Sequence, residues 1–111
     1  MRRTVKAFGR LDIVVASAGV TADAVSWKMT EAQWDAVLEV NLKGCFAIAR
    51  AAAPALRERQ WGRIVFIGSI NGRRGKFGQA NYAASKAGVV GLGKTLALLV
   101  AVRWIETPAA R

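Results

Sequence analysis

Two short runs of consecutive apolar residues stand out along the chain. Residues 11–16 are rich in β-branched side chains and are soon followed by Gly19, and residues 62–68 read Gly-Arg-Ile-Val-Phe-Ile-Gly. Short apolar runs of this kind with glycine nearby are typical of buried strands. Both runs are therefore predicted to be β-strands.

Helical signals fill the rest of the chain. Residues 30–33 read Thr-Glu-Ala-Gln, a capping box in which side chains and backbone N–H groups satisfy one another at a helix start. A second helix is predicted over residues 41–59, with a kink or a weak point at Pro54. A glycine-rich loop over 72–78 precedes a third helix predicted at 81–102.

Strand, helices, strand, loop and helix is the order of a parallel α/β sheet with crossover helices. The predicted fold is a partial Rossmann-type, doubly wound parallel sheet in one domain over residues 1–111. Only two strands are predicted, and two strands do not make a stable open sheet. The apolar fraction of 53% suits a sheet covered on both faces, or a fragment whose covering elements are absent.

The third predicted helix carries a pair of residues suited to proton transfer. Tyr82 and Lys86 are four residues apart and share a helix face, where an ammonium group favours the phenolate. Such a pair can exchange a proton with a carbonyl or alcohol oxygen. Ser69 ends the second strand, where α/β folds bind ligands, and Asn41 lies between two helices. Taken singly, each has a purely structural alternative. Tyr82 and Lys86 could be a surface pair, Ser69 a polar cap at a strand end, and Asn41 a residue that joins two helices.

Together these residues resemble the catalytic core of the short-chain dehydrogenase/reductase family. The resemblance runs over about residues 8–97, and it rests on the segments 41–44, 62–69 and 81–88. The sequence of residues 69–82 resembles that of 3-oxoacyl-carrier-protein reductases and acetoacetyl-CoA reductases in particular.

The resemblance implies a role for each residue of an Asn–Ser–Tyr–Lys tetrad. Tyr82 would protonate the ketone oxygen while a nicotinamide delivers hydride to the carbon. Lys86 would favour the phenolate and hold the nicotinamide ribose. Ser69 would position the carbonyl, and Asn41 would anchor a water molecule in a proton relay.

The resemblance also implies ligands and partners. The cofactor would be NADP or NAD, with NADP favoured, and the substrate a small carbonyl compound, free or linked to CoA or a carrier protein. The residues implied to contact the cofactor are Ala18, Gly19, Tyr82 and Lys86. Those implied to contact the substrate are Ser69, Asn71, Gln79 and Tyr82. Helices 41–59 and 81–102 would form the interface of a homo-oligomer.

Three features depart from the family pattern. No glycine-rich phosphate loop follows an opening strand, and the family's Asn-Asn-Ala-Gly turn reads Ala-Ser-Ala-Gly at residues 16–19. Residues 98–111 diverge, for which a shifted reading frame or a truncated gene is our hypothesis. The alternative to an NAD(P)-dependent reductase is therefore an inactive fragment or an interaction partner of a full-length homologue.

Charge and cysteine content limit the binding partners and the kinds of site that the chain can have. The chain has 17 Lys and Arg against seven Asp and Glu, a net charge of +10, but its basic residues are scattered. The densest group, at residues 73–76, suits either a solvated loop or a phosphate-bearing or acidic carrier, and nucleic-acid binding is not predicted. With one cysteine and no histidine, an internal disulfide and histidine-based metal sites are excluded, and Cys45 is predicted to be a buried small hydrophobe.

No segment approaches the roughly 20 apolar residues of a membrane span. The start of the chain resembles a signal peptide superficially, but Arg10 and Asp12 interrupt the region where its apolar core would begin. A cytoplasmic protein that does not enter a membrane is expected.

Overall fold

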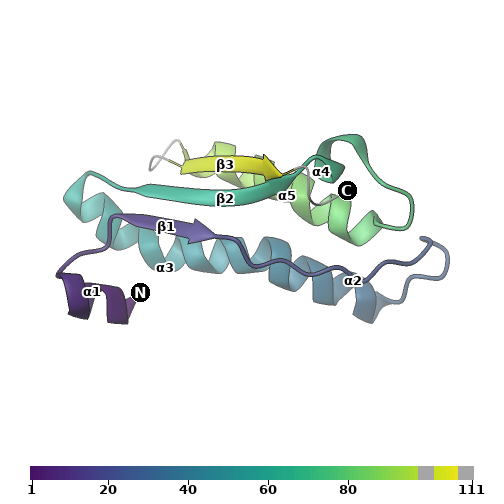
Figure 1. The fold of residues 1–111 in the computed structure, drawn as a ribbon, viewed down its shortest axis with the longest axis horizontal. Coiled ribbons are helices and arrows are strands. Elements are labelled where there is room, and N and C mark those ends of the chain that lie inside the picture. Colours follow the sequence, from purple (N-terminus) through teal and green to yellow (C-terminus); the bar gives the residue numbers. More distant parts are fainter. Residues whose placement is uncertain (98–101, 108–111) are drawn as a thin grey trace.

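The computed structural model describes residues 1–97 and 102–107 (Figure 1). Its elements, in chain order, are α1 (Arg2–Phe8), β1 (Ile13–Ala16), α2 (Glu31–Leu38), the π-helical turn η1 (Glu39–Lys43), α3 (Gly44–Arg59), β2 (Arg63–Ser69), α4 (Asn71–Arg74), α5 (Ala80–Leu96) and β3 (Val102–Thr107). Within these residues no helix is both long and apolar enough to cross a membrane.

The sheet has three parallel strands in the order β1-β2-β3, so β2 lies in the middle. Both predicted strands are confirmed, and the partial α/β fold of the prediction is confirmed with them. The predicted count of two strands was wrong, because Val102–Thr107 adds a third beside β2. The third helix ends at Leu96 and not at 102. The expected divergent tail lies outside the described residues at 98–101 and 108–111.

The capping box forms as predicted at the start of α2. Thr30 Oγ1 accepts a hydrogen bond from the Gln33 backbone N–H at 3.1 Å, and Gln33 Oε1 accepts from the Thr30 backbone N–H at 2.9 Å. Helix α2 runs into the wider turn η1 and then into α3, which continues past Pro54 to its end at Arg59. The two predicted helices are therefore consecutive parts of one long helical segment.

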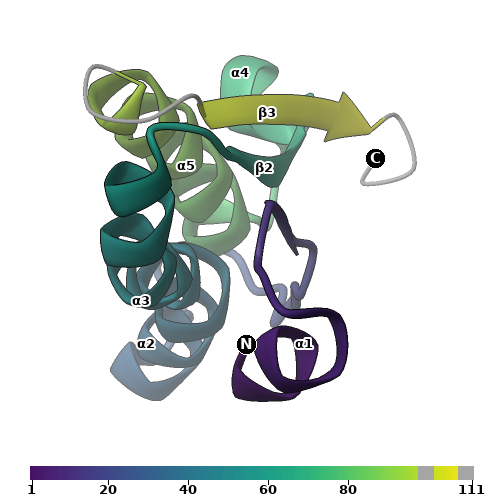
Figure 2. The ribbon, with the colours of Figure 1, turned by 90° about the vertical axis from the view of Figure 1, so that its left-hand side faces the viewer.

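Helices α3 and α5 cover one face of the sheet (Figure 2). The core between them and the strands contains Ala16, Cys45, Ala49, Ala52, Leu56, Ile64, Phe66 and Val89. Cys45 is buried in this core, as predicted. Ile13 and Val15 point to the other face of β1 and are each more than half exposed, at 58% and 56%. The described chain thus covers one face of the sheet only.

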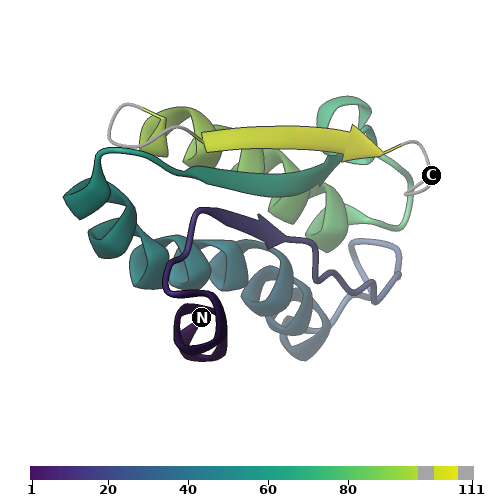
Figure 3. The ribbon, with the colours of Figure 1, turned by 60° about the vertical axis from the view of Figure 1, so that its left-hand side comes forward.

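Two loops meet at the carboxyl ends of the strands (Figure 3). The segment after β1 forms a parallel bridge with the start of α5, pairing Ala24 with Gln79, and the Ala24 N–H donates to the Gly78 oxygen at 2.9 Å. Since β1 and β2 are parallel, their carboxyl ends and these loops share one end of the molecule. The predicted site residues are found at that end.

Candidate active site

A cavity of about 330 Å³ opens at the carboxyl ends of β1 and β2. Its walls come from three parts of the chain: the loop after β1, the end of β2, and the first turns of α5. The lining residues are Ser17, Gly19, Val20, Thr21, Ile67, Gly68, Tyr82 and Lys86. A cavity of this volume is at the lower end of the range for small-molecule sites.

The predicted tyrosine–lysine pair lies in this cavity. Both side chains project from α5 and are at least nine-tenths buried. Lys86 Nζ is 5.8 Å from the centroid of the Tyr82 ring, and it donates a hydrogen bond of 2.9 Å to the Ile67 backbone oxygen on β2. The strand therefore holds the ammonium group at a fixed place beside the phenol.

Burial lowers the pKa of Lys86, because removal from water disfavours the charged amine, and nearby Cys45 opposes this weakly. Burial likewise raises the pKa of the Cys45 thiol, so the thiol stays neutral near pH 7. None of the eight cavity-lining residues is acidic. A cation in such a wall attracts electron-rich oxygens of a ligand.

Asn41 lies behind the cavity wall, in the π-helical turn η1, and is completely buried. Its Oδ1 accepts a hydrogen bond from the Val20 N–H at 2.8 Å, and its Nδ2 donates to the Val20 oxygen at 3.0 Å. The second Nδ2 hydrogen is directed to Ser85 Oγ at 3.2 Å. The amide thus fixes the loop after β1 to the helices and does not itself line the cavity.

The two residues expected to contact a cofactor in the loop after β1 differ in position. Gly19 lines the cavity, and a Cβ atom at this residue would lie 3.6 Å from Lys86 Nζ and 3.6 Å from Asn41 Oδ1. Ala18 is exposed and is not among the lining residues. Of this pair, Gly19 is the residue whose backbone a ligand can approach.

Ser69 is buried directly after Gly68, and its Oγ accepts a hydrogen bond from the Asn71 N–H at 3.2 Å. Asn71 Nδ2 donates to Gln79 Oε1 at 3.1 Å, and Gln79 Nε2 donates to Asp23 Oδ1 at 3.2 Å. None of these three predicted substrate residues lines the cavity, although Ser69 directly follows the lining residue Gly68, and all three are engaged in bonds that brace the segment between β2 and α5.

Sequence reasoning missed two polar side chains of α5, Asn81 and Ser85, which are both completely buried. Asn81 Nδ2 donates to the backbone oxygens of Ala22 at 2.9 Å and Gln33 at 3.1 Å. Ser85 Oγ donates a hydrogen bond of 2.7 Å to the backbone oxygen of Tyr82. Their position beside Tyr82 and Lys86 in the sequence was the only available signal.

The residues present fit the nicotinamide end of a dinucleotide. The cavity offers the Lys86 ammonium as a donor to ribose hydroxyls, and a glycine at residue 19 where a side chain would project toward that ammonium. In the described part of the chain no three Cys, Asp or Glu side chains are grouped so as to hold a metal ion.

A family model described as short chain dehydrogenase matches residues 1–109. The chain belongs to the short-chain dehydrogenase family. Members of this family are NAD(P)-dependent oxidoreductases.

Curated relatives in the family carry several names. The nodulation protein G of Azospirillum brasilense is 46% identical over 101 residues, which are 91% of this chain and 41% of that protein. The acetoacetyl-CoA reductase of Cupriavidus necator is 43% identical over 97 residues, 87% of this chain and 39% of that protein. The 3-oxoacyl-[acyl-carrier-protein] reductase FabG of Thermotoga maritima is 44% identical over 109 residues, 98% of this chain and 44% of that protein. The chain thus spans about two fifths of the length of these relatives.

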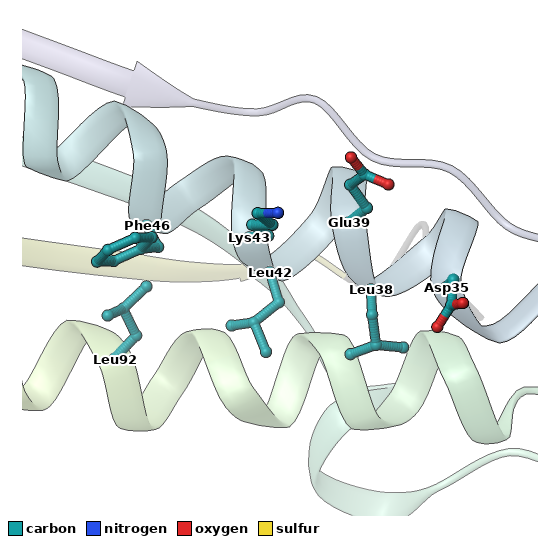
Figure 4. A pocket seen from close by; sticks show the side chains of 7 residues that line it. All are labelled: Asp35, Leu38, Glu39, Leu42, Lys43, Phe46 and Leu92. Atoms are coloured by element: carbon teal, nitrogen blue, oxygen red, sulfur yellow. The ribbon is translucent and has the colours of Figure 1, made fainter.

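A second hollow, of about 620 Å³, lies between the α2–α3 segment and α5, and Tyr82 is not among the residues that line it (Figure 4). Leu38, Leu42 and Phe46 point from that segment toward α5, where Leu92 faces Phe46. Charged residues stand along its rim: Asp35, Glu39 and Lys43. This apolar groove, as we call it below, lies on the two helices expected to form an oligomer interface.

Proposed function

We propose that this chain carries the proton-transferring half of an NAD(P)-dependent carbonyl reductase. The observation that carries the proposal is the convergence of Tyr82, Lys86 and Gly19 on one cavity at the carboxyl ends of parallel strands. A buried phenol with an ammonium group 5.8 Å from its ring centre is suited to proton transfer to a carbonyl oxygen.

The chemistry follows from these groups. When bound, the nicotinamide supplies a hydride for the carbonyl carbon. The Tyr82 hydroxyl gives its proton to the carbonyl oxygen, so the ketone becomes a secondary alcohol, and the phenolate regains a proton from solvent by way of the Lys86 ammonium. Ser69 Oγ orients the carbonyl oxygen after exchanging its present bond with the Asn71 N–H. Asn41 keeps the Gly19–Val20 wall in place through its two bonds to the Val20 backbone.

The proposed substrate is a 3-oxoacyl thioester, and the preferred cofactor is NADPH. Support for the substrate comes from the names of two relatives, an acetoacetyl-CoA reductase and a 3-oxoacyl-[acyl-carrier-protein] reductase. The end of α4 and the loop that follows it add chemical support, since Arg73 and Arg74 on α4 are exposed, as are Lys76 and Phe77 in the loop, the last at 80%. Cationic groups and an aromatic ring suit the phosphate and acyl parts of a carrier-linked substrate.

The first test is a titration of the purified chain with NADPH and with NADH, followed by nicotinamide fluorescence. Saturable binding in the micromolar range, followed by reduction of acetoacetyl-CoA that Tyr82→Phe abolishes, is the expected result. The matched control is Phe8→Leu, at a ring of α1 that is 79% exposed and does not line the cavity, and it should leave nicotinamide binding and reduction unchanged. Absence of binding up to millimolar cofactor would refute the proposal for this chain.

The second candidate function is a non-catalytic interaction partner of a full-length homologue. The exposed Ile13 and Val15 face of β1 and the apolar groove favour it, because both present apolar surface to a partner. In that case a full-length reductase would bind this chain. The wild-type chain and its Tyr82→Phe variant would bind the reductase with equal affinity.

A further inference from the structure

Tyr82 lies in the first turn of α5, the part of a helix that has the fewest backbone hydrogen bonds of its own. Its N–H donates to Asn81 Oδ1 at 2.7 Å, and its backbone oxygen accepts from Ser85 Oγ at 2.7 Å. Helix ends fray unless such bonds hold them. Both peptide groups that flank Tyr82 are thus held by side chains that are completely buried.

The Ser85 hydroxyl also joins α5 to a distant part of the chain. Its single proton is donated to the backbone oxygen of Tyr82, and its oxygen accepts a hydrogen bond from Asn41 Nδ2 at 3.2 Å. The same Asn41 amide holds the Val20 N–H and oxygen on the facing wall of the cavity. Ser85 is therefore the link between the helix turn that carries Tyr82 and the wall formed by residues 19–21.

We propose that Ser85 is a positioning residue for Tyr82: it fixes the distance and orientation of the phenol relative to the Gly19–Thr21 wall. The inference rests on the proposed function, in which these two walls hold the reacting groups. Misplacement of a catalytic group by about 1 Å can cost on the order of 100-fold in rate.

A hydroxyl in a helix can also bond to the preceding turn without any such role, and α5 contains that case as well. Thr95 Oγ1 donates to the Gly91 oxygen at 3.0 Å, near the other end of the helix and exposed to solvent. That bond joins neither Tyr82 nor another element. Thr95→Ala is therefore a matched control for loss of a helix side-chain hydrogen bond.

A second control accounts for loss of stability. Val89 is completely buried one turn after Ser85 and contacts the core beneath the sheet. Val89→Ala destabilises the same helix by making a cavity, without removing a bond to Tyr82. Any effect that Ser85→Ala shares with Val89→Ala is an effect of stability alone.

Tyr82 is the only tyrosine among the 111 residues, so 3-fluorotyrosine labelling gives one ¹⁹F resonance that reports on this site. We expect Ser85→Ala to shift or split this resonance, and Ser85→Thr, which keeps the hydroxyl, to restore it. Thr95→Ala and Val89→Ala should leave one resonance at the wild-type position. In turnover assays Ser85→Ala should lower kcat about tenfold or more with KM within about twofold, as loss of orientation predicts.

The two readouts separate the proposals. If the wild-type chain shows no turnover, the proposed function fails, and the fluorine spectra still decide whether Ser85 holds Tyr82. An unchanged resonance in Ser85→Ala, or an equal change in Val89→Ala at matched stability, would overturn the positioning role. Thermal unfolding of every variant identifies any that does not fold. If Ser85→Thr does not fold, the comparison of Ser85→Ala with Val89→Ala still decides whether Ser85 positions Tyr82.

Discussion

At the scale of single residues, the site places a positive charge where the fold is least able to solvate it. Lys86 is 5% exposed, and its ammonium donates a hydrogen bond to the Ile67 backbone oxygen. Desolvation of a charged amine costs free energy unless a partner compensates for it. A group retained under that cost is a frequent mark of a functional site.

This cost predicts that Lys86→Met stabilises the chain at neutral pH while it removes reductase activity. In the unfolded chain the lysine pKa returns to its usual value, so the unfolded state binds more protons and stability rises with pH up to that value. We expect Lys86→Met to unfold at a higher urea concentration than wild type at pH 7, by on the order of 1 kcal/mol. The difference should shrink as the pH approaches 10, and a constant or growing difference would contradict the prediction.

Gly19 offers a second test at this scale. A Cβ atom there would make ordinary contacts at 3.6 Å with Lys86 Nζ and Asn41 Oδ1, so Gly19→Ala should change stability by less than about 1 kcal/mol. The larger Gly19→Val should fill the space beside the ammonium and lower nicotinamide affinity at least tenfold more than Gly19→Ala does. Isothermal titration with NADPH measures both, and equal affinities of the two variants would show that the cofactor does not approach this glycine.

At the scale of elements, the position of Lys86 depends on how closely α4 approaches α5. A Cβ atom at Gly72 would lie 2.7 Å from the Ala87 nitrogen and 2.8 Å from the Lys86 carbonyl carbon, which are backbone atoms of α5. Backbone of a packed helix does not yield by several tenths of an ångström without moving the helix. Glycine at residue 72 therefore sets the spacing between α4 and the helix that carries the tyrosine and lysine.

Gly72→Ala is accordingly expected to destabilise the fold by about 1–3 kcal/mol and to lower activity through displacement of Lys86. Gly91→Ala is the matched control on α5, because open space surrounds its Cβ position and alanine is the better helix former. It should raise stability by about 0.5–1 kcal/mol. Urea unfolding of both variants checks the pair, and similar midpoints would show that α4 and α5 are not in rigid contact.

The elements also show how far the sequence predicts this fold. The capping box at Thr30 and the β-branched run of β2 are local signals, and both were interpreted correctly. Strand β3 was missed because an apolar run leads from α5 into it without a glycine or proline, and periodicity alone does not separate a buried helix from a strand.

In the candidate site too, features set by local sequence were predictable and features set by distant residues were not. The Tyr82–Lys86 pair was predictable, because helical spacing alone brings the two side chains together. The Asn41–Ser85 bond joins residues 44 positions apart, and the π-helical turn at Glu39–Lys43 that presents Asn41 has no local sequence signal. Long-range polar partners of this kind are fixed by tertiary packing, and the bond between the side chains of Asn71 and Gln79 is another that no local pattern indicates.

At the scale of the whole molecule, the chain is elongated and presents apolar surface on two sides. Its extents are 48 × 23 × 21 Å and its radius of gyration is 15.1 Å, against about 13 Å for a compact domain of about 100 residues. One apolar surface is the open face of β1, and the other is the apolar groove along α2–α3 and α5. With a net charge of +10, self-repulsion opposes non-specific clustering, so any association has to rest on specific apolar contacts.

We expect the apolar groove to mediate self-association, and Phe46→Glu to abolish it. Phe46 is 47% exposed at the groove beside Leu92, so a glutamate there would place a carboxylate in an apolar interface and leave it desolvated. Phe77→Glu is the matched control, because it makes the same change of charge at a ring that is 80% exposed on the loop between α4 and α5. Sedimentation equilibrium should give a dimer for wild type and Phe77→Glu and a monomer for Phe46→Glu. A dimer that survives Phe46→Glu and is lost on Val15→Glu would place the contact on the open face of β1.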